Sequence, residues 1–122
     1  MNIVAIIGAS ADRYKFGNNA VRPFLQRGWT VYPVNPKETQ IEGLPAFKSI
    51  GDVPVRPKVV SVYLAPPIFL KNLAEMAAKG CDELWLNPGT ESAEVLAEAK
   101  SLGLITVQQC SIVALGLSPA KL

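Results

Sequence analysis

The sequence predicts an α/β fold, a Rossmann-like open parallel sheet of five strands with helices on both faces. Two observations support this prediction. Five short apolar runs recur along the chain, and segments with helical periodicity lie between most of them. The runs are rich in β-branched, aromatic and aliphatic residues, as is typical of strands covered on both faces. At 122 residues, 49% of them hydrophobic, the chain is expected to form a single domain over residues 1–122.

The five predicted strands, in chain order, are Ile3–Ile7, Thr30–Val34, Val59–Leu64, Leu84–Leu86 and Leu104–Val107. The first run is too short for the apolar core of a signal peptide, and no basic residue precedes it. A cytoplasmic location is therefore expected. Repeated strand–helix–strand units favour right-handed crossovers and hence parallel strands. Trp29 and Trp85, which lie beside or within strands, are expected in the core.

Three segments between the strands have helical periodicity. Their predicted boundary residues are Asn18 and Gly28 for the first, Pro67 and Gly80 for the second, and Thr90 or Ser92 and Gly103 for the third. Pro23 falls inside the first segment, so that helix is expected either to begin after Asn18 or to be kinked.

Two stretches show no sustained period. Pro36–Pro57 is interrupted by glycines and prolines, which predicts a loop with a short helical turn near Ser49–Val53. Ser101–Ala120 carries no charge, but its polar and glycine residues argue against a membrane span. We expect a strand there, followed by a short buried segment.

Charge and composition exclude several function classes. Twelve basic and ten acidic residues leave a formal net charge of +2, too small to indicate nucleic acid or a membrane as a partner. The chain contains no histidine, which removes the commonest general base and every Ser-His or Cys-His nucleophile. Cys81 and Cys110 are too few for a zinc site, so no metal and no catalytic set are expected.

The carboxyl ends of the strands are the expected place for a ligand, because ligands of open parallel sheets bind there. Each end carries turn-forming or polar residues. The segments are Gly8-Ala9-Ser10, Asn35-Pro36-Lys37, Ala65-Pro66-Pro67, Asn87-Pro88-Gly89-Thr90 and Gln109-Cys110-Ser111.

The first of these segments suits a phosphate. Gly8 would allow backbone N–H groups to approach the ligand, and the Ser10 hydroxyl could donate to it at the start of the first helix. Arg13 and Lys15 follow in the same loop. The alternatives are an ordinary strand-to-helix turn and two solvated surface cations.

The ligand is not expected to be NAD. Of the three glycines of the dinucleotide fingerprint only Gly8 is present, and Asn35 replaces the acidic residue that would bind the ribose hydroxyls. Lys37 favours a phosphate on the adenosine ribose, which NADP and coenzyme A both carry. The lysine of an ATPase phosphate loop is also missing.

The remaining segments predict walls rather than anion sites. The prolines of Ala65-Pro66-Pro67 and Asn87-Pro88-Gly89 offer no N–H donor but fix the shape of a loop against a base or an alkyl-amide arm. The alternative is that these prolines and glycines only form ordinary turns between elements. Cys110 could form a mixed disulfide with a thiol ligand, although a lone cysteine after a strand is also typical of a small buried side chain.

Five stretches carry a resemblance to a known family. They are residues 4–10 (VAIIGAS), 15–18 (KFGN), 31–37 (VYPVNPK), 64–67 (LAPP) and 84–89 (LWLNPG). The chain resembles the small stand-alone CoA-binding domain proteins, which are similar to the N-terminal domain of the succinyl-CoA synthetase alpha subunit. The resemblance covers nearly the whole chain.

The resemblance implies a binding site for coenzyme A. The phosphates would be faced by Gly8, Ala9, Ser10 and the loop through Arg13, Lys15 and Asn18. The adenosine and its ribose phosphate would lie by Asn35, Pro36 and Lys37. The nucleotide and pantetheine would contact Ala65, Pro66 and Pro67, and the pantetheine arm would be bordered by Asn87, Pro88 and Gly89.

The function expected from these observations is binding of coenzyme A or an acyl-CoA, a small-molecule nucleotide ligand, without independent catalysis. Two alternatives remain open. One is an NADP-linked oxidoreductase. The other is an interaction subunit with a vestigial nucleotide pocket, whose protein partner the sequence does not identify.

Overall fold

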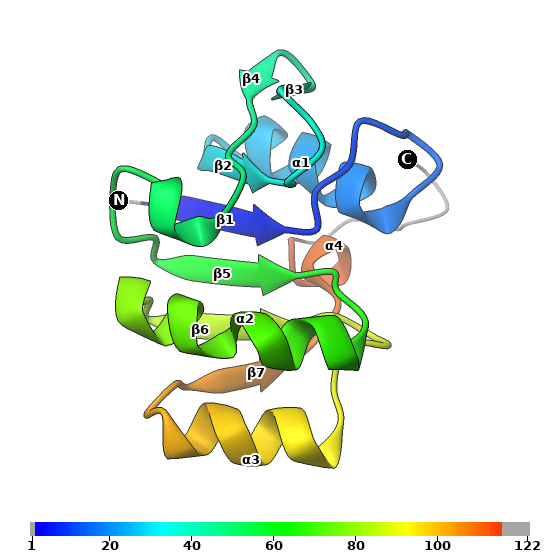
Figure 1. The fold of residues 1–122 in the computed structure, drawn as a ribbon. Helices are drawn as coiled ribbons and strands as arrows, with labels where there is room; N and C mark the ends of the chain where they lie inside the picture. Colours follow the sequence, from blue (N-terminus) through cyan, green and yellow to red (C-terminus); the bar gives the residue numbers. More distant parts are fainter. Residues whose placement is uncertain (1, 116–122) are drawn as a thin grey trace.

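The structure, a computed structural model, describes residues 2–115 and contains a main sheet of five parallel strands, which confirms the predicted fold class. In chain order the elements are β1 (Ile3–Ile7), α1 (Phe16–Gln26), β2 (Thr30–Val34), β3 (Gln40–Ile41), β4 (Leu44–Pro45), the 3₁₀ helix η1 (Ile50–Asp52), β5 (Val59–Val62), α2 (Pro66–Lys79), β6 (Glu83–Leu86), α3 (Ala93–Ser101), β7 (Thr106–Gln108) and α4 (Ser111–Ala114). Figure 1 shows the main strands pointing to one side, where the starts of α1 and α2 also lie.

The order of the strands reverses at one point of the sheet. The strands lie in the order β2-β1-β5-β6-β7, so the chain moves from β1 to β2 on one side and then returns to β5 on the other. Ligands of open parallel sheets bind outside such a switch point. Here it lies between Gly8, which follows β1, and Tyr63, whose N–H still donates to the Ile7 carbonyl at 2.8 Å.

Alternate side chains of β1 enter two separate cores, as the period of a strand requires. Ala5 and Ile7 face a core shared with η1, α2 and α3. Val4 and Ile6 face a second core shared with α1 and the β3–β4 hairpin. Helices therefore cover both faces of the sheet, as predicted.

The two tryptophans lie in the second core, in agreement with the expectation. The ring of Phe24 contacts Trp29 at a centroid distance of 5.0 Å and Trp85 at 6.1 Å. Trp85 is buried, whereas Trp29 is only partly buried at the edge of the core. In residues 2–115 no helix has the length and apolar character needed to cross a membrane.

Helix α1 begins earlier than predicted. Its first residue is Phe16, so Lys15 takes the N-cap position and Asn18 lies within the first turn. The Asn18 side chain does not cap the helix, because its Nδ2 donates to the Ser10 carbonyl at 2.9 Å. The helix also continues through Pro23, whose ring is buried.

The β3–β4 hairpin was not predicted, because the sequence indicated only a loop there. Its strands have two residues each, too few to show a period. Glu42 and Gly43 form the turn, with φ angles of 48° and 78°. Two successive positive φ angles are characteristic of tight hairpin turns. The helical turn expected near Ser49–Val53 is present as η1.

Three strands also differ from the prediction in their boundaries. β6 begins at Glu83, one residue before the predicted Leu84. β5 ends at Val62 rather than Leu64, because both strands beside it end level with that residue, β1 at Ile7 and β6 at Leu86. β7 covers Thr106–Gln108 rather than Leu104–Val107. The segment expected to be buried after it forms α4, of which Ser111 and Ile112 are buried and Val113 is 59% exposed; residues 116–120 of the uncharged stretch lie outside the described residues.

A buried asparagine holds the carboxyl ends of β5 and β6 against α4. Asn87 is 1% exposed, and its Nδ2 donates to the Val62 carbonyl at 2.8 Å and to Ser61 Oγ at 2.9 Å. Its Oδ1 accepts a hydrogen bond from the Ser111 N–H at 2.8 Å. The hydroxyls of Ser61 and Ser111 lie 2.7 Å apart and share a further bond. This network fixes the three elements relative to one another.

Replacement of Asn87 by leucine should therefore destabilise the fold. The side chain keeps its approximate volume but loses all three bonds, which leaves buried polar groups without this partner. We expect Asn87→Leu to lower the free energy of unfolding by about 3 kcal/mol in urea denaturation. As a control, Asn72→Leu loses one exposed bond to the Ile68 carbonyl and should cost less than about 1 kcal/mol. Equal losses in both variants would contradict this assignment.

Candidate functional site

Three cavities follow one another along the carboxyl ends of the strands. The central cavity, of about 270 Å³, is lined by Gly8, Lys15, Phe16, Gly17, Tyr63, Leu64, Ala65, Pro88, Gly89 and Thr90. A cavity of about 210 Å³, here the Lys48 cavity, shares Leu64 with it. A cavity of about 340 Å³, the Cys110 cavity, shares Phe16, Tyr63 and Pro88 with it. The shared walls make the three cavities one continuous series.

The two outer cavities have different linings. The Lys48 cavity is lined by Lys48, Pro36, Ser49 and Asn72 together with apolar side chains. The Cys110 cavity is lined by Phe16, Tyr63, Asn87, Pro88, Cys110 and Val113. One end of the series thus carries a cation, whereas no charged side chain of the described residues lines the other.

Two glycines allow close backbone contacts at the end of β1, Gly8 with the segment after β5 and Gly17 between α1 and Gly8. Gly8 has a φ of 86°, and a Cβ there would lie 2.7 Å from the Tyr63 carbonyl oxygen. A Cβ at Gly17 would lie 2.2 Å from the Gly8 carbonyl oxygen. Both distances are too short for any other residue without a shift of backbone. Gly17 was present in the sequence motif, but no role was predicted for it.

The start of α1 presents free donors to the central cavity. In the described part of the chain the N–H groups of Phe16 and Gly17 have no acceptor, and no side chain caps the helix. The first turn contains no acidic residue, and Lys15 precedes it. Unpaired N–H groups and the positive end of the helix dipole together favour an anion at this position.

The other two long helices do not offer the same donors. α2 begins with Pro66 and Pro67, which have no N–H, and the next two N–H groups donate to the Ala65 carbonyl. The Ser92 Oγ caps α3 by accepting a hydrogen bond from the Val95 N–H at 3.1 Å. Of the three long helices, α1 is therefore the one that presents free N–H donors at the switch point.

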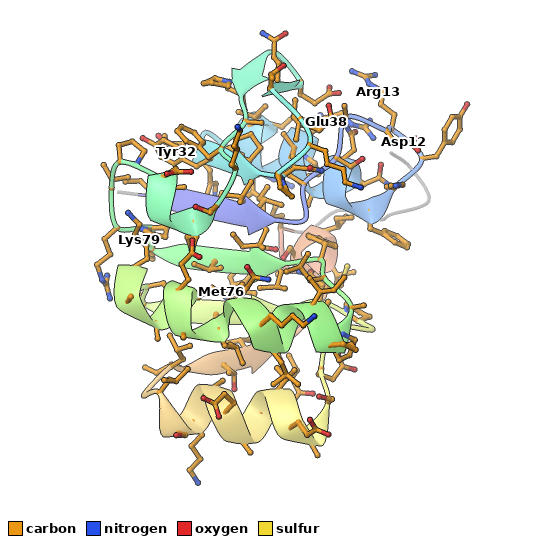
Figure 2. All side chains as sticks on the ribbon, in the orientation of Figure 1. Asp12, Arg13, Tyr32, Glu38, Met76 and Lys79 are labelled. Carbon is orange, nitrogen blue, oxygen red and sulfur yellow. The ribbon has the colours of Figure 1, made fainter. Side chains whose placement is uncertain are left out.

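The loop between β1 and α1 is held by its own hydrogen bonds. Ser10 Oγ accepts from the Asp12 N–H at 3.0 Å, which leaves the hydroxyl hydrogen available to a ligand. Asn18 is buried, and its Oδ1 accepts from Arg22 Nε at 3.0 Å in addition to the bond that its Nδ2 donates to Ser10. Asn18 therefore shapes the loop from within, and Figure 2 shows Asp12 and Arg13 at the outer edge of that loop.

The β3–β4 hairpin anchors the same loop through Glu42. Its carboxylate accepts from Arg13 Nη2 at 2.7 Å and from Asn18 Nδ2 at 3.0 Å. The side chain of Glu42 is 14% exposed and that of Arg13 is 66% exposed. These bonds, the one from Arg13 first, hold the pKa of Glu42 below its ordinary value of 4.5. Arg13 is thus engaged by a carboxylate rather than directed at a cavity.

The turn after β2 is fastened to the loop after β1. Asn35 Nδ2 donates to the Ala9 carbonyl at 2.9 Å, and Asn35 Oδ1 accepts from the Lys37 N–H at 2.8 Å. The Asn35 side chain therefore has a structural role. Pro36 lines the Lys48 cavity, and the Lys37 side chain is exposed beside that turn without an ion pair among residues 2–115.

The structure brings about half of the predicted site residues to the cavity walls. Those that line a cavity are Gly8, Lys15, Pro36, Ala65, Asn87, Pro88, Gly89 and Cys110. Those that line none of the three are Ala9, Ser10, Arg13, Asn18, Asn35, Lys37, Pro66 and Pro67. Residues that line a cavity without having been predicted include Gly17, Lys48, Tyr63, Leu64 and Thr90. Tyr63 and Leu64 had been assigned to a strand, and Lys48 to a loop.

Comparison with known proteins decides the family. The CoA binding domain family matches residues 2–116. The chain belongs to this family. A solved structure of a conserved hypothetical protein from Pyrococcus furiosus is similar to this CoA-binding domain, with a TM-score of 0.83, 30% identity, and coverage of 89% of this chain and 93% of that one.

Larger proteins contain a similar domain. The alpha subunit of the acetate–CoA ligase (ADP-forming) II of Pyrococcus furiosus is 31% identical over 78 residues, which are 63% of this chain and 17% of that subunit. The chain thus spans about a sixth of the length of this relative. The dinucleotide-forming acetyl-coenzyme A synthetase 1 of Candidatus Korarchaeum cryptofilum matches with a TM-score of 0.78 over 88% of this chain and 25% of its own. At 23% identity that likeness supports the fold alone.

Substitution of Glu42 should destabilise the domain in a pH-dependent way. Since the folded-state pKa of Glu42 lies below 4.5, its ionised form contributes stability above that pH, which is lost as the pH falls through the folded-state pKa. We expect Glu42→Gln to lower the free energy of unfolding by about 1 kcal/mol at neutral pH, because Arg13 is largely exposed.

The measurement is urea denaturation of both proteins over a pH series, in which the difference should shrink below pH 4.5. Glu98→Gln on α3 removes an exposed carboxylate elsewhere and serves as the control, with an expected change within about 0.5 kcal/mol. A difference that stays constant through the acid range would show that the charge of Glu42 has no part in holding the loop.

Proposed function

We propose that this CoA-binding domain binds coenzyme A or an acyl-CoA and catalyses no reaction by itself. The start of α1 is the observation that carries the proposal. The free N–H groups of Phe16 and Gly17, together with Lys15, border the central cavity at the switch point of the sheet. They suit the diphosphate of the ligand, and the Ser10 hydroxyl lies in the loop just before them.

The order of the three cavities supports coenzyme A in particular. Its diphosphate lies between a phosphorylated adenosine and a pantetheine arm. The Lys48 cavity, with Pro36 in its wall and Lys37 on the same turn, suits the adenosine and its ribose phosphate. The Cys110 cavity, with Asn87 and Pro88 in its wall, suits the far end of the uncharged arm, which carries the sulfur.

The linings of the cavities also support a binding role. None of the residues that line the three cavities is Asp, Glu or His, so the described site offers no general base of these types. The ligase activity of the larger relatives belongs to proteins of which this chain spans a minor part. We propose that any such reaction would need a further polypeptide.

A ligand panel tests this function against its alternatives. Mass spectrometry of the gently purified protein should find coenzyme A or an acyl-CoA. Thermal denaturation with CoA, dephospho-CoA, NADP and NAD should then show the largest stabilisation with CoA, about 2.7 kcal/mol at a hundredfold excess over the Kd. Stabilisation by NADP alone would favour an oxidoreductase. No response to any of the four would favour an interaction subunit.

Lys37 is proposed as a partner of the ribose phosphate. Lys37→Ala should weaken CoA binding in titration calorimetry by about 1 to 2 kcal/mol, the scale of a charge-assisted hydrogen bond, and should weaken dephospho-CoA much less. Lys100→Ala, which removes an exposed lysine from α3, is the matched control and should change neither ligand. Equal losses of both ligands in Lys37→Ala would make Lys37 an ordinary surface charge.

A further inference from the structure

The Cys110 cavity is the largest of the three and has an apolar, uncharged wall. Its volume is about 340 Å³. Phe16 and Val113 line it and are 60% and 59% exposed, so two large apolar side chains of this one wall are open to solvent. Covering such side chains with an apolar group would remove their surface from water, which is favourable in proportion to the area covered.

Tyr63 lies in the wall that the central and Cys110 cavities share. Its hydroxyl oxygen is buried, with the side chains of Ser61 and Ser111 beside it, and burial raises the pKa of the phenol to about 12. The phenol therefore stays neutral, and Tyr63 adds no charge to the wall of the Cys110 cavity.

The position of the cavity identifies the part of the ligand that it would hold. It continues from the central cavity through Phe16, Tyr63 and Pro88, on the side opposite the Lys48 cavity. A ligand with its diphosphate at α1 and its adenosine toward Lys48 would therefore place its sulfur end here. Free coenzyme A ends in a thiol, which would leave much of this volume to water.

We infer that the Cys110 cavity binds the acyl group of an acyl-CoA thioester, and that it selects acyl groups that are apolar and carry no charge. This inference rests on the proposed function. A dry apolar cavity of about 150 Å³ can hold a benzene ring, so the available volume accepts a short aliphatic or an aromatic acyl group. An acyl group with a free carboxylate would be disfavoured, because no cation among residues 2–115 lines the cavity to balance its desolvation.

Titration calorimetry with three probes tests the inference. CoA, benzoyl-CoA and succinyl-CoA share the nucleotide and the pantetheine arm, and differ only at the sulfur. Benzoyl-CoA should bind about tenfold more tightly than CoA, and succinyl-CoA no more tightly than CoA. A reducing buffer keeps Cys110 and the CoA thiol from forming a disulfide.

Variants at exposed positions make the test specific to the cavity. Val113→Lys places a cation at the wall, so it should weaken benzoyl-CoA about fivefold and tighten succinyl-CoA. Ile105→Lys is the matched control, because Ile105 is also β-branched and is 65% exposed but lines none of the three cavities. It should leave the order of the three ligands unchanged.

The outcomes separate this inference from the proposed function. If CoA itself does not bind, the proposed function fails. If CoA binds but benzoyl-CoA binds no more tightly than CoA, only the acyl site is overturned. The acyl site is also overturned if succinyl-CoA binds as tightly as benzoyl-CoA. The same holds if Val113→Lys changes the affinity of neither benzoyl-CoA nor succinyl-CoA. A preference for benzoyl-CoA that appears only after removal of residues 116–122 would assign the cavity to those residues and would also overturn the inference.

Discussion

The close contact between the Gly8 backbone and the first turn of α1 is the constraint on which the site depends. Because Gly17 has no Cβ, the helix can start directly against the end of β1, at a distance that leaves no room for a side chain. That approach places free N–H groups at the switch point of the sheet, and it forces the intervening loop to fold outward. The outward loop in turn requires the support that Asn18 and Glu42 provide.

Amide side chains carry much of the tertiary organisation around the cavities. Asn18 holds the loop after β1, Asn35 joins that loop to the turn after β2, and Asn87 joins β5, β6 and α4. In the sequence all three were candidates for ligand contact. An asparagine at the end of a strand looks the same in a sequence whether it faces a ligand or a neighbouring backbone, because either role uses the same donors and acceptor.

The parts of the fold that could be predicted are those with a local cause. Periodicity located the main strands and the three longest helices, and Ser92 was correctly considered as a cap. The start of α1 could not be predicted, because it depends on contact between residues from two elements. The β3–β4 hairpin has strands too short to show alternation, so the partner of Arg13 and the place of Lys48 were missed with it.

The two prolines at the start of α2 have a consequence for where an anion can lie. Two helices begin beside the switch point, and two uncapped helix starts would offer two competing positions for one anionic group. Because Pro66 and Pro67 remove the first donors of α2, the backbone itself leaves α1 as the favoured position. A single position fixes the middle of a long anionic ligand, so the direction of its two ends would depend on the different linings of the outer cavities.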